Sequence, residues 1–279
     1  MSITPGYADV LVGLQYGDEG KAKIVDHLAH GYDIIARFNG GANAGHTIRT
    51  PVGSAKLAQV PSGAFHPDKL LYIGSGCAVN LEKLAGEIDA LERAGLTLDG
   101  RLRISGRCVV VQPVHIRMDV LHGSDIGTTG NGIGPCYADL AIRMRSGCRT
   151  VVQLRDLHEN LDLAFGQMAA YDRLSEARSE AHEADIAACL DRLRAAWTRI
   201  RPFVTMDDLF RIGALDVSQL ADAAIRHAVD EIYLNKCDSL ALFPDKASGA
   251  IPVFDEASLR WFPPSQDRWI TVCPHRCAV

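Results

Sequence analysis

A turn rich in glycine and charge lies near the start of the chain, with the form GxxxGDEGK over residues 13–21. It places two carboxylates, Asp18 and Glu19, directly before Gly20 and Lys21. The backbone N–H groups of a glycine turn, continued by a helix N-terminus, can hold an anion, and Lys21 adds a positive charge for phosphate oxygens. The pattern therefore predicts a phosphate-binding turn.

The two carboxylates are unusual in such a turn, because they would repel a phosphate. They are explained if Asp18 contacts Mg²⁺, or if it acts as a base beside a transferred phosphoryl group. The turn is similar to a P-loop without matching it, because Ala22 stands where GxxxxGK[ST] has Ser or Thr. The alternative is an ordinary helix N-terminus whose acidic residues complement the helix dipole.

A second polar loop, FNGGANAGHT, follows at residues 38–47. Its three glycines allow a ligand to approach the backbone closely. Asn43 can donate a hydrogen bond to a phosphate, and His46 can serve as an acid near neutral pH. We therefore expect this loop to contact a ligand as well.

A third glycine-rich stretch, GSDIGTTGNGIGPCYAD, occupies residues 123–139. Its glycines and proline predict a loop, and its threonine hydroxyls suit phosphate oxygens. A fourth pattern, YLNKCDSL, ends an apolar run with Asn235, Lys236 and Asp238. In an NKxD arrangement of this kind the aspartate accepts from the N–H groups of guanine, while the other two residues shape the pocket.

Strand-like and helix-like segments alternate around these loops, which predicts an α/β fold with a mainly parallel central sheet and flanking helices. Apolar runs closed by glycine predict strands, and apolar residues at helical spacing predict helices. Strands are expected at 7–16, 32–41, 70–79, 101–111 and 227–238, and helices at 22–30, 81–95 and 216–229. Residues 155–200, rich in Ala, Leu and charged residues, predict a cap of two or three helices with a solvated charged face.

Length and composition fit one domain over residues 1–279 of a cytoplasmic protein. The net charge of −5 disfavours a nucleic-acid binder, because no basic excess exists to neutralise phosphates. We expect no membrane association, since neither a long apolar run nor a signal-peptide profile is seen. The eight cysteines lack zinc-site spacing and are expected to be reduced thiols.

Taken together, the motifs resemble the adenylosuccinate synthetase family, the GTP-dependent ligases that join aspartate to the 6-position of IMP. The family's GDEGKGK is similar to GDEGKAK at Gly17–Lys23, its NxGHT loop to residues 43–47, and its GTTGRGIGP to Gly127–Pro135. The resemblance runs from Tyr7 to about Arg145 and resumes from about Leu215 to Leu240. It implies a P-loop-like GTP-dependent ligase fold, here with a helical cap insertion.

The resemblance also implies roles for single residues. Asp18 would remove the N1 proton of the purine and bind Mg²⁺, with the Gly45 carbonyl as a second metal ligand. His46 would act as the acid in phosphoryl transfer to O6, and Lys21 would hold the transferred phosphate. The GTP-binding residues would be Gly17, Gly20, Lys21, Gly45, His46, Thr47, Asn235, Lys236 and Asp238. The purine nucleotide would be held by Asn43, Thr128, Thr129 and Arg143, the last of these from the partner in a homodimer.

The chain departs from the family's pattern in the region that would bind the amino acid. Residues 197–215 contain neither the GAQ segment nor the Thr- and Arg-rich loop that clamps aspartate, and Asn131 stands in place of an arginine. Three hypotheses follow. The first is a ligase that joins an amine, either aspartate or another, to an IMP-like nucleotide. The second is an enzyme that stops at GTP-dependent phosphorylation or GTP hydrolysis, and the third is a non-catalytic paralogue that binds guanine nucleotide and regulates a partner. Retention of both Asp18 and His46 favours catalysis.

Overall fold

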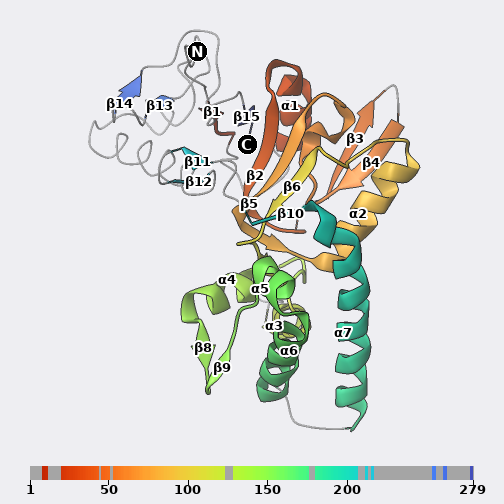
Figure 1. The fold of residues 1–279 in the computed structure, drawn as a ribbon, viewed down its shortest axis with the longest axis vertical. Helices are drawn as coiled ribbons and strands as arrows, with labels where there is room; N and C mark the ends of the chain where they lie inside the picture. Colours follow the sequence, from red (N-terminus) through yellow and green to blue (C-terminus); the bar gives the residue numbers. More distant parts are fainter. Residues whose placement is uncertain are drawn as a thin grey trace.

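The computed structural model is a mixed α/β structure in which helices flank a parallel central sheet, as the sequence predicts (Figure 1). It describes residues 8–11, 20–43, 45–50, 53–122, 128–175, 180–206, 211–212, 215–216, 253–255, 260–262 and 277–278.

Within the described residues, seven strands form the central sheet, in the order β1-β15-β2-β5-β6-β10, with β7 paired to the end of β5. Every pair in it is parallel. The strands are β1 (Ala8–Asp9), β2 (Ile34–Gly40), β5 (Leu70–Val79), β6 (Leu102–Ser105), β7 (Val109–Val110), β10 (Val204–Thr205) and β15 (Cys277–Ala278). The remaining described strands form antiparallel pairs: β3 (His46–Thr50) with β4 (Gly53–Leu57), β8 (Met144–Arg145) with β9 (Cys148–Arg149), β11 (Arg211–Ile212) with β12 (Leu215–Asp216), and β13 (Val253–Asp255) with β14 (Arg260–Phe262).

The helices lie on the faces of the sheet and beyond one end of it (Figure 1). They are α1 (Lys21–Leu28), α2 (Leu81–Arg93), α3 (Pro113–His122), α4 (Ile133–Ile142), α5 (Leu154–Glu159), α6 (Leu161–Ser175) and α7 (Glu180–Ile200), with the 3-10 turns η1 (Ala29–Gly31), η2 (Ser62–Phe65) and η4 (Arg201–Phe203). None of the helices in the described residues is both long and apolar enough to span a bilayer.

Helix α2 shows how local sequence sets an element. The Asn80 side chain accepts a hydrogen bond of 3.0 Å from the Lys83 backbone N–H and so caps the helix N-terminus. Its inward face is apolar at helical spacing, with Leu84, Ile88 and Leu91 fully buried. Both the strand at 70–79 and this helix confirm the sequence prediction.

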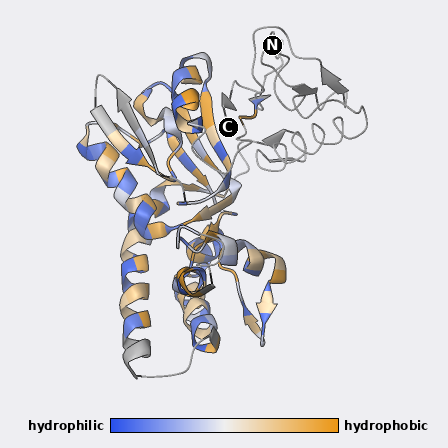
Figure 2. Cartoon of the chain, turned by 180° about the vertical axis from the view of Figure 1, so that it is seen from behind, coloured by the Kyte–Doolittle hydropathy of each residue, from blue (hydrophilic) through white to orange (hydrophobic). Residues whose placement is uncertain are grey.

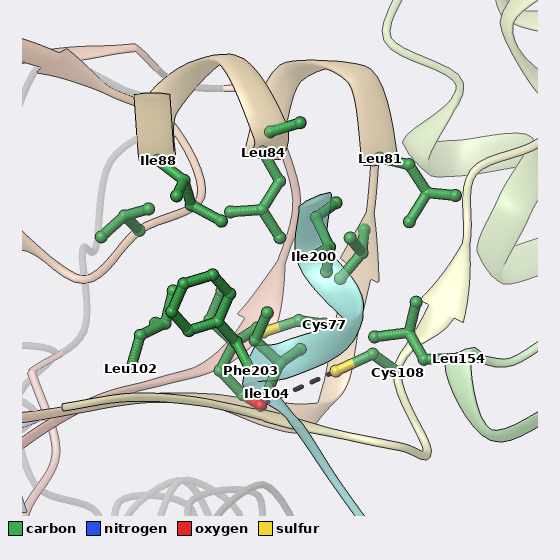
Figure 3. Close-up of a cluster of buried hydrophobic side chains, with 14 of the residues drawn as sticks. Cys77, Leu81, Leu84, Ile88, Leu102, Ile104, Cys108, Leu154, Ile200 and Phe203 are labelled. Atoms are coloured by element: carbon green, nitrogen blue, oxygen red, sulfur yellow. Dashed lines mark hydrogen bonds between the residues drawn. The ribbon is translucent and has the colours of Figure 1, made fainter. Parts of the chain in front are cut away.

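The main core lies between the sheet, α2 and the segment that leads from α7 into η4. Figure 3 shows Leu84 and Ile88 of α2 facing Ile200, the last residue of α7, and Phe203, the last residue of η4. Figure 2 shows hydrophobic residues along the central strands and an alternation of hydrophobic and hydrophilic residues along α7. Burial of this apolar surface is what fixes α2 against the sheet.

Two expectations need correction. The strand expected at 101–111 is broken into β6 and β7, because the Cys108 N–H bonds back to the Ser105 carbonyl at 3.0 Å in a turn. The loop expected over 123–139 ends at Gly132, since Ile133 begins α4. Pro135 is compatible with that helix because it lies in the first turn, where its missing N–H costs nothing. The elements expected at 216–229 and 227–238 lie almost wholly outside the described residues.

Three helices, α5 to α7, occupy the segment expected to form a cap, and α6 and α7 extend away from the sheet (Figure 1). Charged side chains of α7 pair with α2 at the surface, where Arg199 lies 2.6 Å from Asp89 and Arg192 lies 2.8 Å from Glu82. These pairs fasten α7 along α2. The assignment of one domain with a cap subregion stays a prediction.

The thiols in the described residues are free. Cys77, Cys108 and Cys136 are buried, whereas Cys148 and Cys189 are half-buried. Burial raises the pKa of Cys77 to about 11 and that of Cys136 to about 12. These two thiols therefore stay protonated and unreactive at neutral pH, in line with the interpretation of the cysteines as reduced thiols.

Candidate functional site

The N-terminus of α1 carries the described part of the first motif. Gly20 precedes the helix with φ 76°, a left-handed conformation that glycine adopts readily, and its carbonyl accepts from the Lys23 N–H at 2.9 Å. Lys21, half-buried, is the first residue of α1. Gly20, at the N-cap position, has no side chain that could cap the helix, and the positive end of the helix dipole lies there. Gly17 and Asp18 lie outside the described residues.

The loop from Gly41 to Gly45, here the β2–β3 loop, is held by close packing at its start. A Cβ on Gly41 would lie 2.4 Å from Ile133 Cδ1 and 2.6 Å from the Ala78 carbonyl oxygen, so only glycine fits. The Gly40 N–H donates to the Tyr137 hydroxyl at 2.9 Å, and that hydroxyl donates to the Gly76 carbonyl at 2.6 Å. The loop is therefore locked onto the end of β5 and the start of α4.

Arg37 joins the start of the same loop to the segment at residues 58–60, which Glu87 holds. Arg37 donates to the Gly41 carbonyl at 3.2 Å and also to the Ala58 carbonyl. The Glu87 carboxylate accepts backbone N–H groups of residues 58–60 at 2.9 to 3.1 Å. Burial raises the pKa of Glu87, although these backbone hydrogen bonds oppose the shift. Arg37 therefore ties the start of the loop to backbone that Glu87 fixes.

The loop before α4, here the α3–α4 loop, is described over residues 128–132. Thr128 and Thr129 are exposed there. The Asn131 Nδ2 donates to Thr129 Oγ1 at 2.7 Å, and Asn131 Oδ1 accepts from the Lys83 ammonium of α2. The Gly132 N–H donates to the buried carboxylate of Asp119 at 2.8 Å. Side-chain hydrogen bonds therefore hold residues 129–131, whereas Gly132 is also packed closely on α3, since a Cβ there would lie 2.8 Å from the Ile116 nitrogen.

These segments meet at one edge of the sheet. The β2–β3 loop follows the carboxyl end of β2, and its Gly41 packs on Ile133, directly after the α3–α4 loop. Helix α1 contacts β3, the strand that begins at His46. The carboxyl edge of a parallel sheet is the usual place for ligands in such folds. The structure thus places the start of the β2–β3 loop beside the start of α4, and α1 beside β3.

Gly45 ends the β2–β3 loop, and His46 and Thr47 begin β3, which pairs with β4. Gly45 and Thr47 are exposed. His46 pairs with Leu57 and Thr47 with Lys56 in the antiparallel register. The Lys56 side chain lies over Gly45, because a Cβ there would be 2.6 Å from Lys56 Cε. Lys56 therefore adds a cation that the sequence did not single out, since only the hairpin register brings it to Gly45.

Arg143 ends α4 in a conformation that is uncommon for a side chain. Its φ is 66°, its N–H donates to the Asp139 carbonyl at 2.8 Å, and it is exposed. A residue other than glycine held at such a φ costs of order 1–3 kcal/mol and must be maintained by its surroundings. Arg143 is thus an exposed residue at the C-cap of α4.

A buried polar cluster anchors α4 beneath the site. Asp139 Oδ2 accepts from the Tyr171 hydroxyl at 2.5 Å and lies 3.2 Å from His115 Nε2. Burial alone would raise the pKa of Asp139, but the hydrogen bonds from His115 and Tyr171 and the charge of Arg145 hold it below its ordinary value. The carboxylate therefore stays ionised and keeps both partners in place.

The structure tests the metal prediction only in part. No group of three or more His, Cys, Asp or Glu side chains within the described ranges could hold a metal ion. Gly45 is exposed and offers a backbone carbonyl, the hard type of oxygen ligand that Mg²⁺ accepts. Asp18, Asn235, Lys236 and Asp238 lie outside the described residues. The predicted roles of the site residues stay predictions.

Comparison with known proteins gives a consistent result. The family model described as adenylosuccinate synthetase matches residues 10–210. Adenylosuccinate synthetase 2 of Cupriavidus pinatubonensis is 60% identical over 200 residues, which cover 72% of this chain and 43% of that protein. The adenylosuccinate synthetase of Chlorobaculum tepidum is 40% identical over 209 residues, covering 73% of this chain and 47% of that protein.

A solved structure agrees with these matches. The fully ligated adenylosuccinate synthetase of Plasmodium falciparum is 28% identical, with a TM-score of 0.56 over 72% of this chain and 46% of that chain. The chain thus spans less than half the length of the relatives it matches. The match covers the three glycine-rich motifs but not Asn235, Lys236 or Asp238.

Proposed function

We propose that this chain, which belongs to the adenylosuccinate synthetase family, is a GTP-dependent C–N ligase that phosphorylates the 6-oxo group of an IMP-like purine nucleotide and replaces it with an amine. The observation that supports this best is that the β2–β3 loop packs on the start of α4 at the carboxyl edge of the sheet, while α1 contacts β3, the strand that follows this loop. Two phosphate-bearing substrates need two such anion-binding segments side by side.

In the proposed reaction the Asp18 carboxylate takes the N1 proton of the purine, and O6 attacks the γ-phosphorus of GTP. An O6–P bond forms, the bond from phosphorus to the β-phosphate oxygen breaks, and GDP leaves. His46 acts as the acid beside the transferred group, and Lys21 holds its oxygens. The amine then attacks C6, and phosphate leaves with the former carbonyl oxygen while the amine loses a proton.

Mg²⁺ would be held by Asp18 and the Gly45 carbonyl, where it would neutralise phosphate charge. The GTP base would be read by Asn235, Lys236 and Asp238, and the phosphate of the purine nucleotide by Asn43, Thr128 and Thr129. We further propose a cytoplasmic homodimer in which Arg143 reaches into the partner's site, consistent with its exposed place at the end of α4.

A second candidate is GTP-dependent phosphorylation or hydrolysis without ligation. It is favoured by the family match, which ends at residue 210 of this chain. The sequence also lacks the aspartate clamp expected by resemblance to the family. A non-catalytic regulatory paralogue is the third candidate, and it predicts GTP binding without turnover.

One assay separates the three candidates. The purified protein is given GTP and Mg²⁺, with and without IMP and aspartate, and the products are resolved by mass. Adenylosuccinate with GDP supports ligation of aspartate. GDP formed only when IMP is present, without adenylosuccinate, shows activation of the purine, and a new product on addition of another amine then supports ligation of that amine. GDP formed without IMP, or an activated purine that no amine of the panel consumes, supports the second candidate. Absence of turnover with a panel of 6-oxopurine nucleotides and amines, while GTP still binds, supports the regulatory paralogue.

Variants tie the activity to the proposed base. Asp18→Asn should lower turnover by a factor of about 100 or more while GTP binding is largely kept. Asp99→Asn is the matched control, since Asp99 is exposed and precedes β6 at the opposite edge of the sheet. Equal turnover in Asp18→Asn and the wild type would contradict the proposed mechanism.

A further inference from the structure

Lys83, in the first turn of α2, reaches the α3–α4 loop across 48 residues of sequence. Its ammonium donates to Asn131 Oδ1, and Asn131 Nδ2 donates to Thr129 Oγ1 at 2.7 Å. Lys83 and Thr129 are exposed, and Asn131 is half-buried. The three side chains form a continuous hydrogen-bonded relay that ends on a hydroxyl predicted to contact a phosphate.

The direction of the relay follows from what each group can donate. An ammonium has donors only, so the oxygen of the Asn131 amide must face Lys83, and the NH₂ group must face Thr129. Thr129 Oγ1 then accepts within the relay, which leaves its own hydrogen available for another acceptor. A hydroxyl oriented in this way is a donor for an anionic oxygen.

Charge adds to this orientation. Glu82, the neighbour of Lys83, pairs with Arg192 of α7 at 2.8 Å and is thereby directed to a different partner. Lys83 therefore brings a positive charge to the loop. The charge polarises the amide of Asn131, and through it favours an anion at Thr129.

We propose that Lys83 is a positioning residue that gives the α3–α4 loop its preference for a nucleoside monophosphate over a nucleoside. This inference rests on the proposed function, in which Thr129 binds the phosphate of the purine nucleotide. Asn131 stands where the family resemblance leads us to expect arginine, and an amide by itself brings no charge. Here α2 supplies the cation and the amide carries its effect to Thr129.

The chain offers clean variants for the test. The α2 N-cap uses the backbone N–H of Lys83, so replacing its side chain leaves the cap in place. Lys83→Met keeps the length of the side chain and removes both the charge and the donor. Arg93→Met is the matched control, because it removes an exposed cation from the last turn of the same helix.

The experiment measures Kd for IMP and for inosine by isothermal titration calorimetry on the 279-residue chain. Lys83→Met should weaken IMP binding about tenfold, equivalent to about 1.4 kcal/mol, with inosine and GTP affinity unchanged. Asn131→Asp should give a similar loss, because a carboxylate still accepts from Lys83 but cannot donate to Thr129. Arg93→Met should leave all three affinities as in the wild type.

Two results would overturn the inference while leaving the proposed function intact: unchanged IMP affinity in Lys83→Met, or an equal loss for IMP and inosine. A wild-type protein that binds no 6-oxopurine nucleoside monophosphate would instead remove the proposed function, and the inference with it. Lys83→Arg keeps the charge and the donors, so it should retain most of the IMP affinity. If Lys83→Arg lost as much IMP affinity as Lys83→Met, the inference would also be overturned.

Discussion

The β2–β3 loop and the α3–α4 loop meet at Gly41 and Ile133, yet they are held in place by different interactions. The first is fixed by close packing against Ile133 and Ala78 and by the hydroxyl of the half-buried Tyr137. Residues 129–131 of the second are fixed by polar side chains, two of which are exposed, and close packing on α3 begins only at Gly132. A loop fixed by packing tolerates few changes, whereas a loop fixed by exposed hydrogen bonds can change its ligand preference at little cost in stability.

This difference fits the place where the chain departs from the pattern of its family. The NxGHT loop is kept, while the segment that resembles GTTGRGIGP carries Asn131. A substitution in the polar loop can be compensated from another element, as Lys83 does from α2. No comparable compensation exists for a side chain at Gly41, because backbone lies 2.6 Å from its Cβ position.

The largest expected effect is on the packed loop. Gly41→Ala places a methyl group 2.6 Å from the Ala78 carbonyl oxygen, and backbone must move to admit it. We expect the free energy of unfolding to fall by about 3 kcal/mol, the upper part of the range for overpacking. Urea denaturation followed by circular dichroism measures it.

Gly86 provides the control for that variant. It lies within α2, and a Cβ there would meet nothing within 4 Å. Gly86→Ala should therefore raise stability by about 0.5–1 kcal/mol, because alanine is the better helix former. If Gly41→Ala were as stable as Gly86→Ala, the β2–β3 loop would not be fixed by packing.

A second test acts on α4, which supports both loops. Asp139→Asn leaves one of the donors, Tyr171 or His115, facing an NH₂ group, which should cost about 2 kcal/mol at pH 7. The pKa of Asp139 is lower in the fold than its ordinary value of 3.8. Its stabilising contribution is therefore complete above that value and is lost as the pH falls through the folded pKa.

The difference in stability between the wild type and Asp139→Asn should consequently shrink below about pH 4. Thermal unfolding of both proteins between pH 3 and pH 8 measures it. If the difference in stability between the wild type and Asp139→Asn stayed constant down to pH 3, the ionised carboxylate would not be what holds His115 and Tyr171.

A smaller effect is expected at Tyr137. Tyr137→Phe keeps the ring and removes the hydroxyl that accepts from the Gly40 N–H and donates to the Gly76 carbonyl. The expected loss is about 1 kcal/mol, typical of one buried hydrogen-bonding group. Hydrogen exchange at the Gly40 amide gives a local readout, and it should accelerate in the variant. If the exchange rate of the Gly40 amide were unchanged in Tyr137→Phe, the Tyr137 hydroxyl would not be what holds Gly40 in place.

The smallest effect on stability is expected in the polar loop. Asn131→Ala removes hydrogen bonds that are close to solvent, so the free energy of unfolding should change by less than about 0.5 kcal/mol. Affinity for IMP should nevertheless fall, since the relay to Thr129 is broken. A large loss of stability in Asn131→Ala would show that the two loops do not differ in how much their fixing interactions contribute to stability.

Local signals made much of the fold predictable. The strand at Leu70–Val79 and the helix at Leu81–Arg93 were expected because an apolar run, a capping Asn80 and helical spacing act over a few residues. Helix α4 was read as part of a loop, because glycine and Pro135 mark turns and helix starts alike.

The sequence predicts the motifs of the site, but it does not predict the tertiary contacts that hold their loops in place. Tyr137 reaches Gly40 across 97 residues and Lys83 reaches Asn131 across 48, separations over which sequence patterns carry no signal. The positive φ of Arg143 could not be foreseen either, since nothing in its residue type demands it. Tertiary contacts decided each of these.

The place of β15 in the sheet has a consequence for the order of folding. Cys277 and Ala278 lie between β1 and β2, pairing with Ala8 and Asp9 on one side and with Ile34 and Ile35 on the other. Strand β1 therefore joins the sheet through residues that the ribosome adds more than 260 positions later. The sheet from β2 to β6 can assemble during synthesis, but the strand that leads into the phosphate-binding turn gains its neighbour only after residue 278 has emerged.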